Sequence, residues 1–254
     1  MNSVVQRSQC AIVVGATGAF GQHIVRGLAA QGLEVLAVAR RAESLHELVS
    51  RCEGVRACQA DMDSDEAIAT LAASIRWPVR MVVHGPGVTV AGGILDAPTA
   101  TMTAAVNTKV GGLLRLVRAA DAHLQRGSRI VAIGGHYGLE PTAYAASAGV
   151  ANAALVNVVR QLSLALGSRG ITAHTIVPGP ANTERLHKVA ATRAAQRGVS
   201  VEAVLEELKA ESSIGELTTP EQVAWAVEML LDPRADAMTG SSFMLDSGRR
   251  RGLP

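Results

Sequence analysis

Residues Cys10 to Gly21 read CAIVVGATGAFG, a short apolar run that leads into glycines spaced three apart and then into a helical pattern. Ala11 to Val14 is typical of a strand buried on both faces. Gly15, Gly18 and Gly21 permit a tight turn, a close approach of the backbone to a pyrophosphate, and close packing of helix on strand. An anion is favoured at the N-terminus of such a helix. The stretch predicts a nucleotide-binding strand, loop and helix, with an ordinary glycine turn as the alternative.

The composition is that of one large globular domain. The chain has 254 residues, 48% of them apolar, and a formal net charge of +2. This length supports a single core, so we expect one domain over residues 1–254. The arginines are scattered, and two Trp, two Tyr and two Phe offer few rings for stacking on bases. We therefore expect no nucleic-acid partner.

Cysteine usage and the terminal segments bear on the compartment. Cys10, Cys52 and Cys58 form an odd set without metal-ligand spacing, which predicts reduced thiols and no bound metal. Residues 1–9 are short and polar and do not resemble a signal peptide, and we see no apolar run approaching the length of a membrane span. We expect a cytoplasmic protein with no membrane partner, whose C-terminal GRRRGLP is a solvated end.

Strand and helix patterns alternate along the chain. Strands are expected at residues 11–14, 33–39, 55–60, 79–84, 128–133, 171–177 and 242–245. Helices are expected at residues 20–31, 67–75, 99–124 and 143–166, in two stretches within 184–211, and after Thr219, the predicted N-cap. This order predicts an α/β Rossmann fold, a doubly wound parallel sheet with helices on both faces, whose ligands bind beyond the carboxyl ends of the strands.

Two strand ends carry charged residues that bear on the choice of cofactor. Arg40 and Arg41 end the second strand, where an acidic residue would bind the ribose 2′-hydroxyl of NAD and arginine would pair with the 2′-phosphate of NADP. They predict NADP, with solvated charges as the alternative. Asp61 follows the third strand, where it could accept a hydrogen bond from the adenine amino group. Alternatively Asp61, Asp63 or Ser64 is the N-cap of the next helix.

Several motifs together make the chain resemble the short-chain dehydrogenase/reductase family over nearly its full length. They are GATGAFG at 15–21, ARR at 39–41, Asp61, Asn107 within a long helix, Tyr144 at the start of the next one, PGPANT at 178–183, TPEQVA at 219–224 and TGSSFMLDSG at 239–248. The spacing of the first glycines resembles that of the family's extended members, because Ala19 stands where a compact member carries a glycine. The length and the C-terminal signature resemble the compact branch.

The resemblance implies a seven-stranded sheet, a nicotinamide cofactor, hydride transfer to or from a small-molecule substrate, and a homodimer or homotetramer. It also implies that residues 184–215 form a flap over the substrate. The residues expected to hold NADP(H) are Gly15, Thr17, Gly18, Phe20, Gly21, Arg40, Arg41, Asp61, Met62, Gly85, Pro178, Gly179 and Thr183.

The family's chemistry depends on an asparagine, a serine, a tyrosine and a lysine four residues after the tyrosine. Asn107 and Tyr144 match this set. Ala148 occupies the lysine position, and Gly134 and Gly135 stand where a pair of serines is expected. We interpret Lys109 as a solvated lysine on another helix face.

Other polar groups could replace the missing ones. His136 and Tyr137 lie in the loop before Tyr144, and His84 lies where the family has an asparagine-rich motif. Each histidine has a plain alternative: His84 as a satisfied polar residue at a strand end, and His136 as a solvent-facing loop residue.

Two functions fit this sequence. The first is an NADP(H)-dependent reductase of a small-molecule carbonyl group, with an atypical proton-transfer site around Tyr144. The second keeps the fold and the cofactor pocket but catalyses a non-redox step, such as dehydration, isomerisation or cyclisation, or senses the nucleotide without catalysis.

Overall fold

The computed structural model describes residues 9–90 and 92–252, and the predicted polar N-terminus lies almost wholly outside that part. Seven strands form one parallel sheet in the order β3-β2-β1-β4-β5-β6-β7. They are β1 (Cys10–Val14), β2 (Glu34–Ala39), β3 (Val55–Gln59), β4 (Val79–His84), β5 (Leu124–Ile133), β6 (Thr172–Pro178) and β7 (Ser242–Leu245). The predicted seven-stranded, doubly wound sheet is confirmed.

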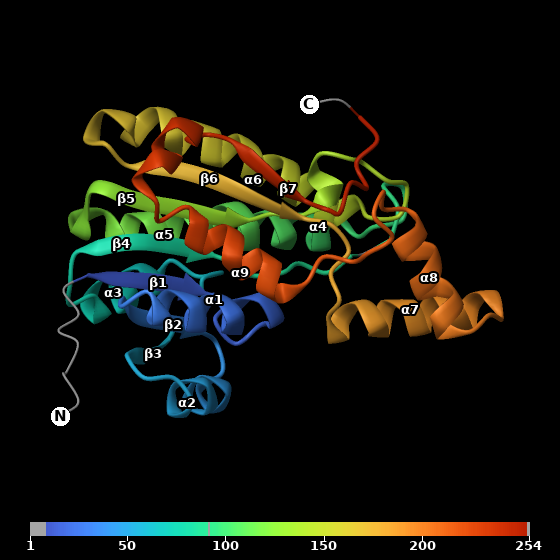
Figure 1. The fold of residues 1–254 in the computed structure, drawn as a ribbon, viewed down its shortest axis with the longest axis horizontal. Coiled ribbons are helices and arrows are strands. Elements are labelled where there is room, and N and C mark those ends of the chain that lie inside the picture. Colours follow the sequence, from blue (N-terminus) through green and yellow to red (C-terminus); the bar gives the residue numbers. More distant parts are fainter. Residues whose placement is uncertain (1–8, 91, 253–254) are drawn as a thin grey trace.

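Helices cover both faces of the sheet (Figure 1). Alternate residues of β1 point to opposite faces: Ile12 packs with α3 (Glu66–Ser74), α5 (Gly112–Ala120) and α6 (Ala146–Leu166), whereas Val13 packs with α1 (Ala19–Ala30), α2 (Ala42–Ser50) and α9 (Pro220–Met229). This alternation explains why the strand is apolar throughout: both of its faces are buried.

Two helices stand apart from the sheet. α7 (Glu184–Arg197) and α8 (Val201–Ala210) form a small apolar cluster of their own, and in Figure 1 they lie beyond one end of the sheet. Gly198, with φ 65°, ends α7 in the left-handed conformation and allows the chain to turn into α8. The expected pair of helical stretches around this glycine is confirmed, and their function as a flap stays a prediction.

The long helix expected at residues 99–124 is interrupted. α4 (Thr99–Val106) passes into a π-helical turn, Asn107–Gly111, and then into α5, and a 3-10 turn, Asp121–His123, follows. The amide of Gly112 donates to the carbonyl of Asn107, five residues back, which widens the helix. One continuous α-helix was expected over this stretch, and the π-helical turn was not recognised from the sequence.

Helix starts differ from the expectation in two places and agree in one. α6 begins at Ala146, so Tyr144 lies in the turn before the helix. α3 begins at Glu66 with Asp65 as its N-cap, but Asp65 forms no side-chain cap bond, and the hydroxyl of Ser64, one of the expected caps, accepts from the amide of Glu66 at 3.4 Å. At α9 the expected start is confirmed, with Thr219 in a reciprocal capping box.

One helix is more apolar than the sequence analysis allowed. The segment Ala146–Arg169, which includes α6, is long and apolar enough to cross a membrane by length and composition alone. The expectation that no such run exists was therefore wrong. Leu155 and Val159 of α6 lie in the main core against the sheet, however, so the helix serves here as one layer of the fold.

The C-terminal segment is only partly solvated, because Arg249 is buried whereas its glycines and Arg251 are exposed. Arg249 is 8% exposed, donates to the carbonyl of Leu208 on α8 at 3.3 Å and forms an ion pair with Glu211. The amide of Gly252 donates to Glu140 at 3.2 Å. The segment thus ties α8 to the loop before Tyr144; residues 253–254 lie outside the described part.

Candidate functional site

The glycine loop brings the ends of β1 and β4 close together. Gly15 has φ 79°, and a Cβ at this position would lie 3.1 Å from the backbone carbon of Gly85. A Cβ on Gly21 would overlap the carbonyl oxygen of Gly15 and lie 2.8 Å from the Cα of Ala16. The chain leaves β1 toward β2 and β4 toward β5, so these glycines line the switch point where sheets of this kind bind their ligands.

The remaining residues expected at the adenosine half lie along the same edge. Gly18 is the N-cap of α1, and Phe20 lies in the first turn of this helix. The carbonyl of Thr17 accepts from the side-chain amide of Gln22 at 3.1 Å. Met62 is buried, and the Asp61 carboxylate accepts from the backbone of Asp63 at 3.1 Å.

Arg40 and Arg41 are exposed at the end of β2. Within residues 9–90 and 92–252, neither guanidinium forms an ion pair with a carboxylate of the chain. Both are therefore available to an anionic ligand.

The nicotinamide half of the predicted site lies at the ends of β4 and β6. The amide of Gly85 donates to the carbonyl of Val14 at 3.0 Å, and that of Gly179 donates to Leu245 at 2.9 Å. Pro178 ends β6, and Thr183 caps α7 by accepting from the amide of Leu186 at 3.3 Å. The sheet thus gathers both predicted halves at its carboxyl edge.

Tyr144 lies at this edge in a pair with Tyr137. Their hydroxyl oxygens are 3.1 Å apart, and the rings meet edge to face with centroids 5.7 Å apart. Tyr144 is 39% exposed, and the guanidinium carbon of Arg193, from α7, lies 4.8 Å from its ring centroid. Burial, together with the hydrogen bond to Tyr144, raises the pKa of Tyr137 to about 12. Tyr137 therefore keeps its proton at neutral pH.

Asn107 is not hydrogen-bonded to the tyrosine pair. Its amide nitrogen donates to the carbonyl of Asp63 at 2.9 Å, and its amide oxygen accepts from Arg115 at 2.9 Å. The residue also lines a surface depression of about 420 Å³ along α4, together with Met102, Thr103 and Val106. Both ends of the amide are occupied, so its predicted catalytic function rests on the family resemblance alone.

Lys109 corrects the sequence analysis. It is not solvated: it is 3% exposed, and its ammonium donates to the carbonyl of Ile133, the last residue of β5, at 2.7 Å. Burial, and to a smaller extent the charge of Arg185, lowers its pKa to about 7. The sequence offered no sign of this burial, because its local pattern does not show which face of this helix points into the protein.

The two candidate histidines are both buried. His84 is fully buried, its Nε2 lies 2.9 Å from the carbonyl of Thr108, and burial lowers its pKa to about 3, so it is neutral at physiological pH. This geometry favours the polar strand-end alternative. The Nδ1 of His136 lies 3.6 Å from the Asp246 carboxylate, and burial lowers its pKa. The solvent-facing alternative for His136 is therefore wrong.

Asn152 is a residue that the sequence analysis missed. It is 5% exposed on α6, and its amide nitrogen lies 2.8 Å from where a Cβ on Gly135 would stand. A serine at position 135, as the family resemblance implies, would collide with it unless Asn152 moved. The amide oxygen of Asn152 is buried without a hydrogen-bond partner in the described part of the chain. No spacing rule in the sequence links these two positions.

The α7 arginines separate into two groups. Arg193 lies over Tyr144, and Arg185 donates to the carbonyl of Val88 at 2.5 Å, beside the loop after β4. Arg197 instead forms a two-bond ion pair with Glu207 of α8. Arg185 and Arg193 thus reach the candidate site, and Arg197 joins the two helices.

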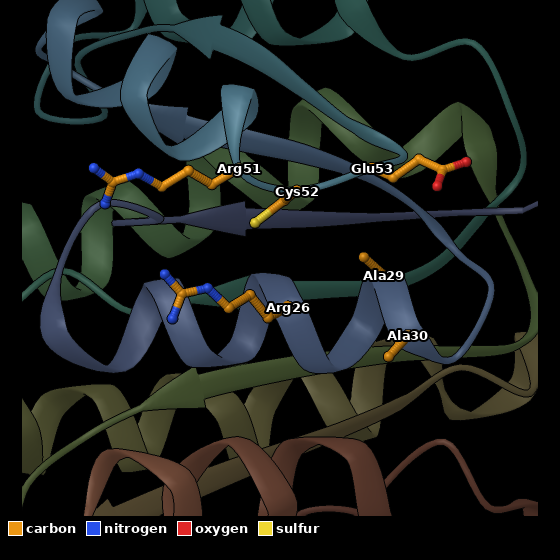
Figure 2. Close-up of a pocket in the computed structure, with 6 residues that line it drawn as sticks. All are labelled: Arg26, Ala29, Ala30, Arg51, Cys52 and Glu53. Carbon is orange, nitrogen blue, oxygen red and sulfur yellow. The ribbon is translucent and has the colours of Figure 1, made fainter.

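A second pocket lies away from this site. It measures about 260 Å³ and is lined by α1 and by the residues after α2: Arg26, Ala29, Ala30, Arg51, Cys52 and Glu53 (Figure 2). These residues lie toward the C-terminal ends of α1 and α2, and the pocket does not contribute to the tyrosine site.

Comparison with known proteins agrees with this architecture. The family model described as enoyl-(acyl carrier protein) reductase matches residues 15–250. The chain is 30% identical to a putative ketoacyl reductase of Streptomyces coelicolor, over 96% of this chain and 97% of that one. It is 27% identical to the short-chain reductase protein NovJ of Streptomyces niveus, over 96% and 95%.

Among solved structures, the L-sorbose reductase from Gluconobacter frateurii, complexed with NADPH and L-sorbose, superposes with a TM-score of 0.88 at 22% identity, covering 97% of this chain and 98% of that one. This likeness shows the shared fold. Because the family model and the curated relatives both extend over almost the whole sequence, the chain belongs to the short-chain dehydrogenase/reductase family.

Proposed function

We propose that this protein is an NADP(H)-dependent oxidoreductase that reduces a carbonyl group of a small molecule, with Tyr144 as the proton donor. The observation that carries the proposal is Tyr144, which is 39% exposed and whose hydroxyl lies 3.1 Å from that of Tyr137, at the ligand-binding edge of the sheet. The curated relatives are named as reductases, and the superposed L-sorbose reductase was solved with NADPH, which supports the same class of reaction here.

The residues present fit NADP(H). The backbone around Gly15 and Gly21 is packed too closely for a Cβ at either position, and the α1 N-terminus, which favours an anion, follows directly. Arg40 and Arg41 stand unpaired by any described carboxylate at the end of β2, and β2 itself ends in Ala39 instead of an acid. These positions would hold the pyrophosphate and the 2′-phosphate.

The chain's own groups would carry the proton. When bound, the cofactor supplies the hydride. The hydroxyl of Tyr144 can donate its proton to the carbonyl oxygen as that oxygen becomes negative. Tyr137, still protonated, can donate a hydrogen bond to the resulting phenolate, and the positive charge of Arg193 favours the same anion. Solvent can then restore the proton, because the Tyr144 side chain is 39% exposed.

The non-redox interpretation receives less support. It needs an acid or base in contact with substrate, but His84 is fully buried and His136 faces Asp246. Of His84, His136 and Tyr144, Tyr144 is the one whose side chain is exposed at this edge. We therefore place reduction first.

Cofactor preference tests the first half of the proposal. The purified protein should bind NADPH at least tenfold more tightly than NADH in a fluorescence titration. The Arg40→Ala/Arg41→Ala variant should lose about 10- to 100-fold in NADPH affinity, because a charge-assisted hydrogen bond contributes roughly 1.5–3 kcal/mol, while its NADH affinity stays the same.

Arg51→Ala is the matched control. Arg51 is also an exposed arginine; it is the C-cap of α2 and forms an ion pair with Glu47 in that helix. Its replacement should change neither the NADPH affinity nor the NADH affinity. Equal binding of NADPH and NADH by the unaltered protein would overturn the assignment of the two arginines. Absence of binding by either nucleotide would overturn the proposed function itself.

A further inference from the structure

The buried lysine of the π-helical turn is the feature of this structure that the proposed function leaves unexplained. Lys109 is 3% exposed, and one of its three N–H groups donates to Ile133. Within the described residues no carboxylate lies within 4.0 Å of its ammonium. A buried cation without a carboxylate lowers stability, so a partner from outside the chain would account for its presence.

The ammonium lies at the carboxyl edge of the sheet. Ile133 is the last residue of β5, and one of its side-chain carbons lies 3.8 Å from the position of a Cβ on Gly85. Gly85 in turn is close to Gly15, as described above. Lys109 therefore stands between the ends of β4 and β5, on the nicotinamide side of the glycine loop.

The groups that face Lys109 cannot neutralise it. β4 contributes His84, which is neutral, and α7 contributes Arg185, which carries the same charge. The π-helical turn also packs against α6, whose residues 146–155 include no charged side chain. Ala148, one turn after Tyr144, is buried there in place of a lysine.

We propose that Lys109 binds the hydroxyl groups of the nicotinamide ribose of NADPH and takes up a proton when the cofactor binds, so that the cation missing from α6 is supplied from the opposite helix. This inference rests on the proposed function. The proton comes from solvent, and no covalent bond changes. The two N–H groups that Ile133 does not use are the donors.

The pH dependence follows from this assignment. In the free protein the pKa of Lys109 is about 7, and the negative charge of NADPH favours the ammonium form. Binding therefore raises the pKa and draws in a proton, so NADPH affinity should fall as the pH rises above 7, by up to tenfold per pH unit. The 2′-phosphate of the nucleotide also titrates, and the same measurement on Lys109→Met separates the two effects.

The chain contains three lysines, which makes a direct measurement possible: Lys109, Lys188 and Lys209. Lys188 and Lys209 are more exposed and pair with Glu184 and Glu206. In protein labelled with lysine that carries ¹³C at Cε, one of three NMR signals should titrate near pH 7 and be absent from Lys109→Met. Saturating NADPH should move its midpoint upward by at least one pH unit.

Binding provides the second readout. Lys109→Met should bind NADPH about 10- to 100-fold more weakly at pH 7 and lose the fall in affinity above pH 7. Lys209→Met is the control and should keep both the NADPH affinity at pH 7 and its fall above pH 7. The Lys109→Met protein should unfold at an equal or higher urea concentration, because a buried charge has been removed, so weaker binding would not reflect a failure to fold.

The outcomes separate this inference from the proposed function. If NADPH binds tightly but leaves the Lys109 signal and its midpoint unchanged, or if Lys109→Met binds as well as the unaltered protein, the inference is overturned and the reductase proposal stands. If NADPH does not bind to the unaltered protein, both fall.

Discussion

Replacing Tyr144 by phenylalanine is expected to slow carbonyl reduction by about 10²- to 10⁴-fold, the range by which a positioned general acid accelerates such a step. The phenyl ring keeps the edge contact with Tyr137 and lies under Arg193 as before. Only the donated proton is lost, so NADPH affinity and the urea midpoint should not change. The measurement is NADPH oxidation, followed by absorbance, over a panel of aldehydes, ketones and 3-oxoacyl thioesters.

Tyr137→Phe is the matched control for this experiment. It removes the other hydroxyl of the pair, which supports Tyr144 but does not donate to substrate in our proposal. We expect a loss of about fivefold to tenfold, corresponding to one hydrogen bond of roughly 1 kcal/mol. A fully active Tyr144→Phe variant with a flat pH profile would show that another group supplies the proton. Tight NADPH binding without turnover of any panel member would favour the non-redox interpretation.

Replacing Gly21 by alanine is expected to destabilise the fold and abolish cofactor binding together. The new Cβ would overlap the carbonyl oxygen of Gly15 and lie 2.8 Å from the Cα of Ala16, both backbone atoms that cannot rotate away. Overpacking of this kind costs about 1–3 kcal/mol or more, which outweighs the gain of up to ~1 kcal/mol in helix propensity. Urea unfolding measures the first effect, and NADPH fluorescence measures the second.

Gly27→Ala, in the same helix, controls for the general effect of alanine in α1. Its Cβ would meet the carboxylate of Glu228, the flexible end of a side chain that can move aside. The hydrogen bond between Gln31 and Glu228 is exposed, so its loss is of small consequence. We expect stability and NADPH affinity within a few tenths of a kcal/mol of the unaltered protein. A Gly21→Ala variant as stable as this control would contradict the close approach of α1 to β1.

The adenosine half of the candidate site was accessible from the sequence because its signals are local. A strand, a turn and a helix start lie within twelve residues at Cys10 to Gly21, and steric limits on the backbone require glycine at those points. Arg40 and Arg41 follow a strand directly, so their place at the sheet edge follows from the strand itself. Their function as 2′-phosphate ligands stays a prediction until binding is measured.

The proton-transfer half was not accessible in the same way. The contact between Tyr137 and Tyr144 depends on the irregular path of the segment between β5 and α6, and that of Tyr144 with Arg193 depends on how this segment meets α7. Lys109 was assigned to solvent because its place two residues after Asn107 puts it on another helix face, where a solvated lysine was expected. That other face of the π-helical turn points into the protein, and the Lys109 side chain is buried there.

The sequence by itself determined the order of strands and helices, the parallel sheet and the glycine loop, because periodicity and backbone sterics act over a few residues. Only the tertiary structure decided which polar groups face one another. The burial of Lys109, the hydrogen bond from Asn107 to Asp63, and the packing of Asn152 against Gly135 each result from contacts between different segments of the chain. Such contacts depend on the angle at which helices meet the sheet, and no spacing rule in one segment encodes that angle.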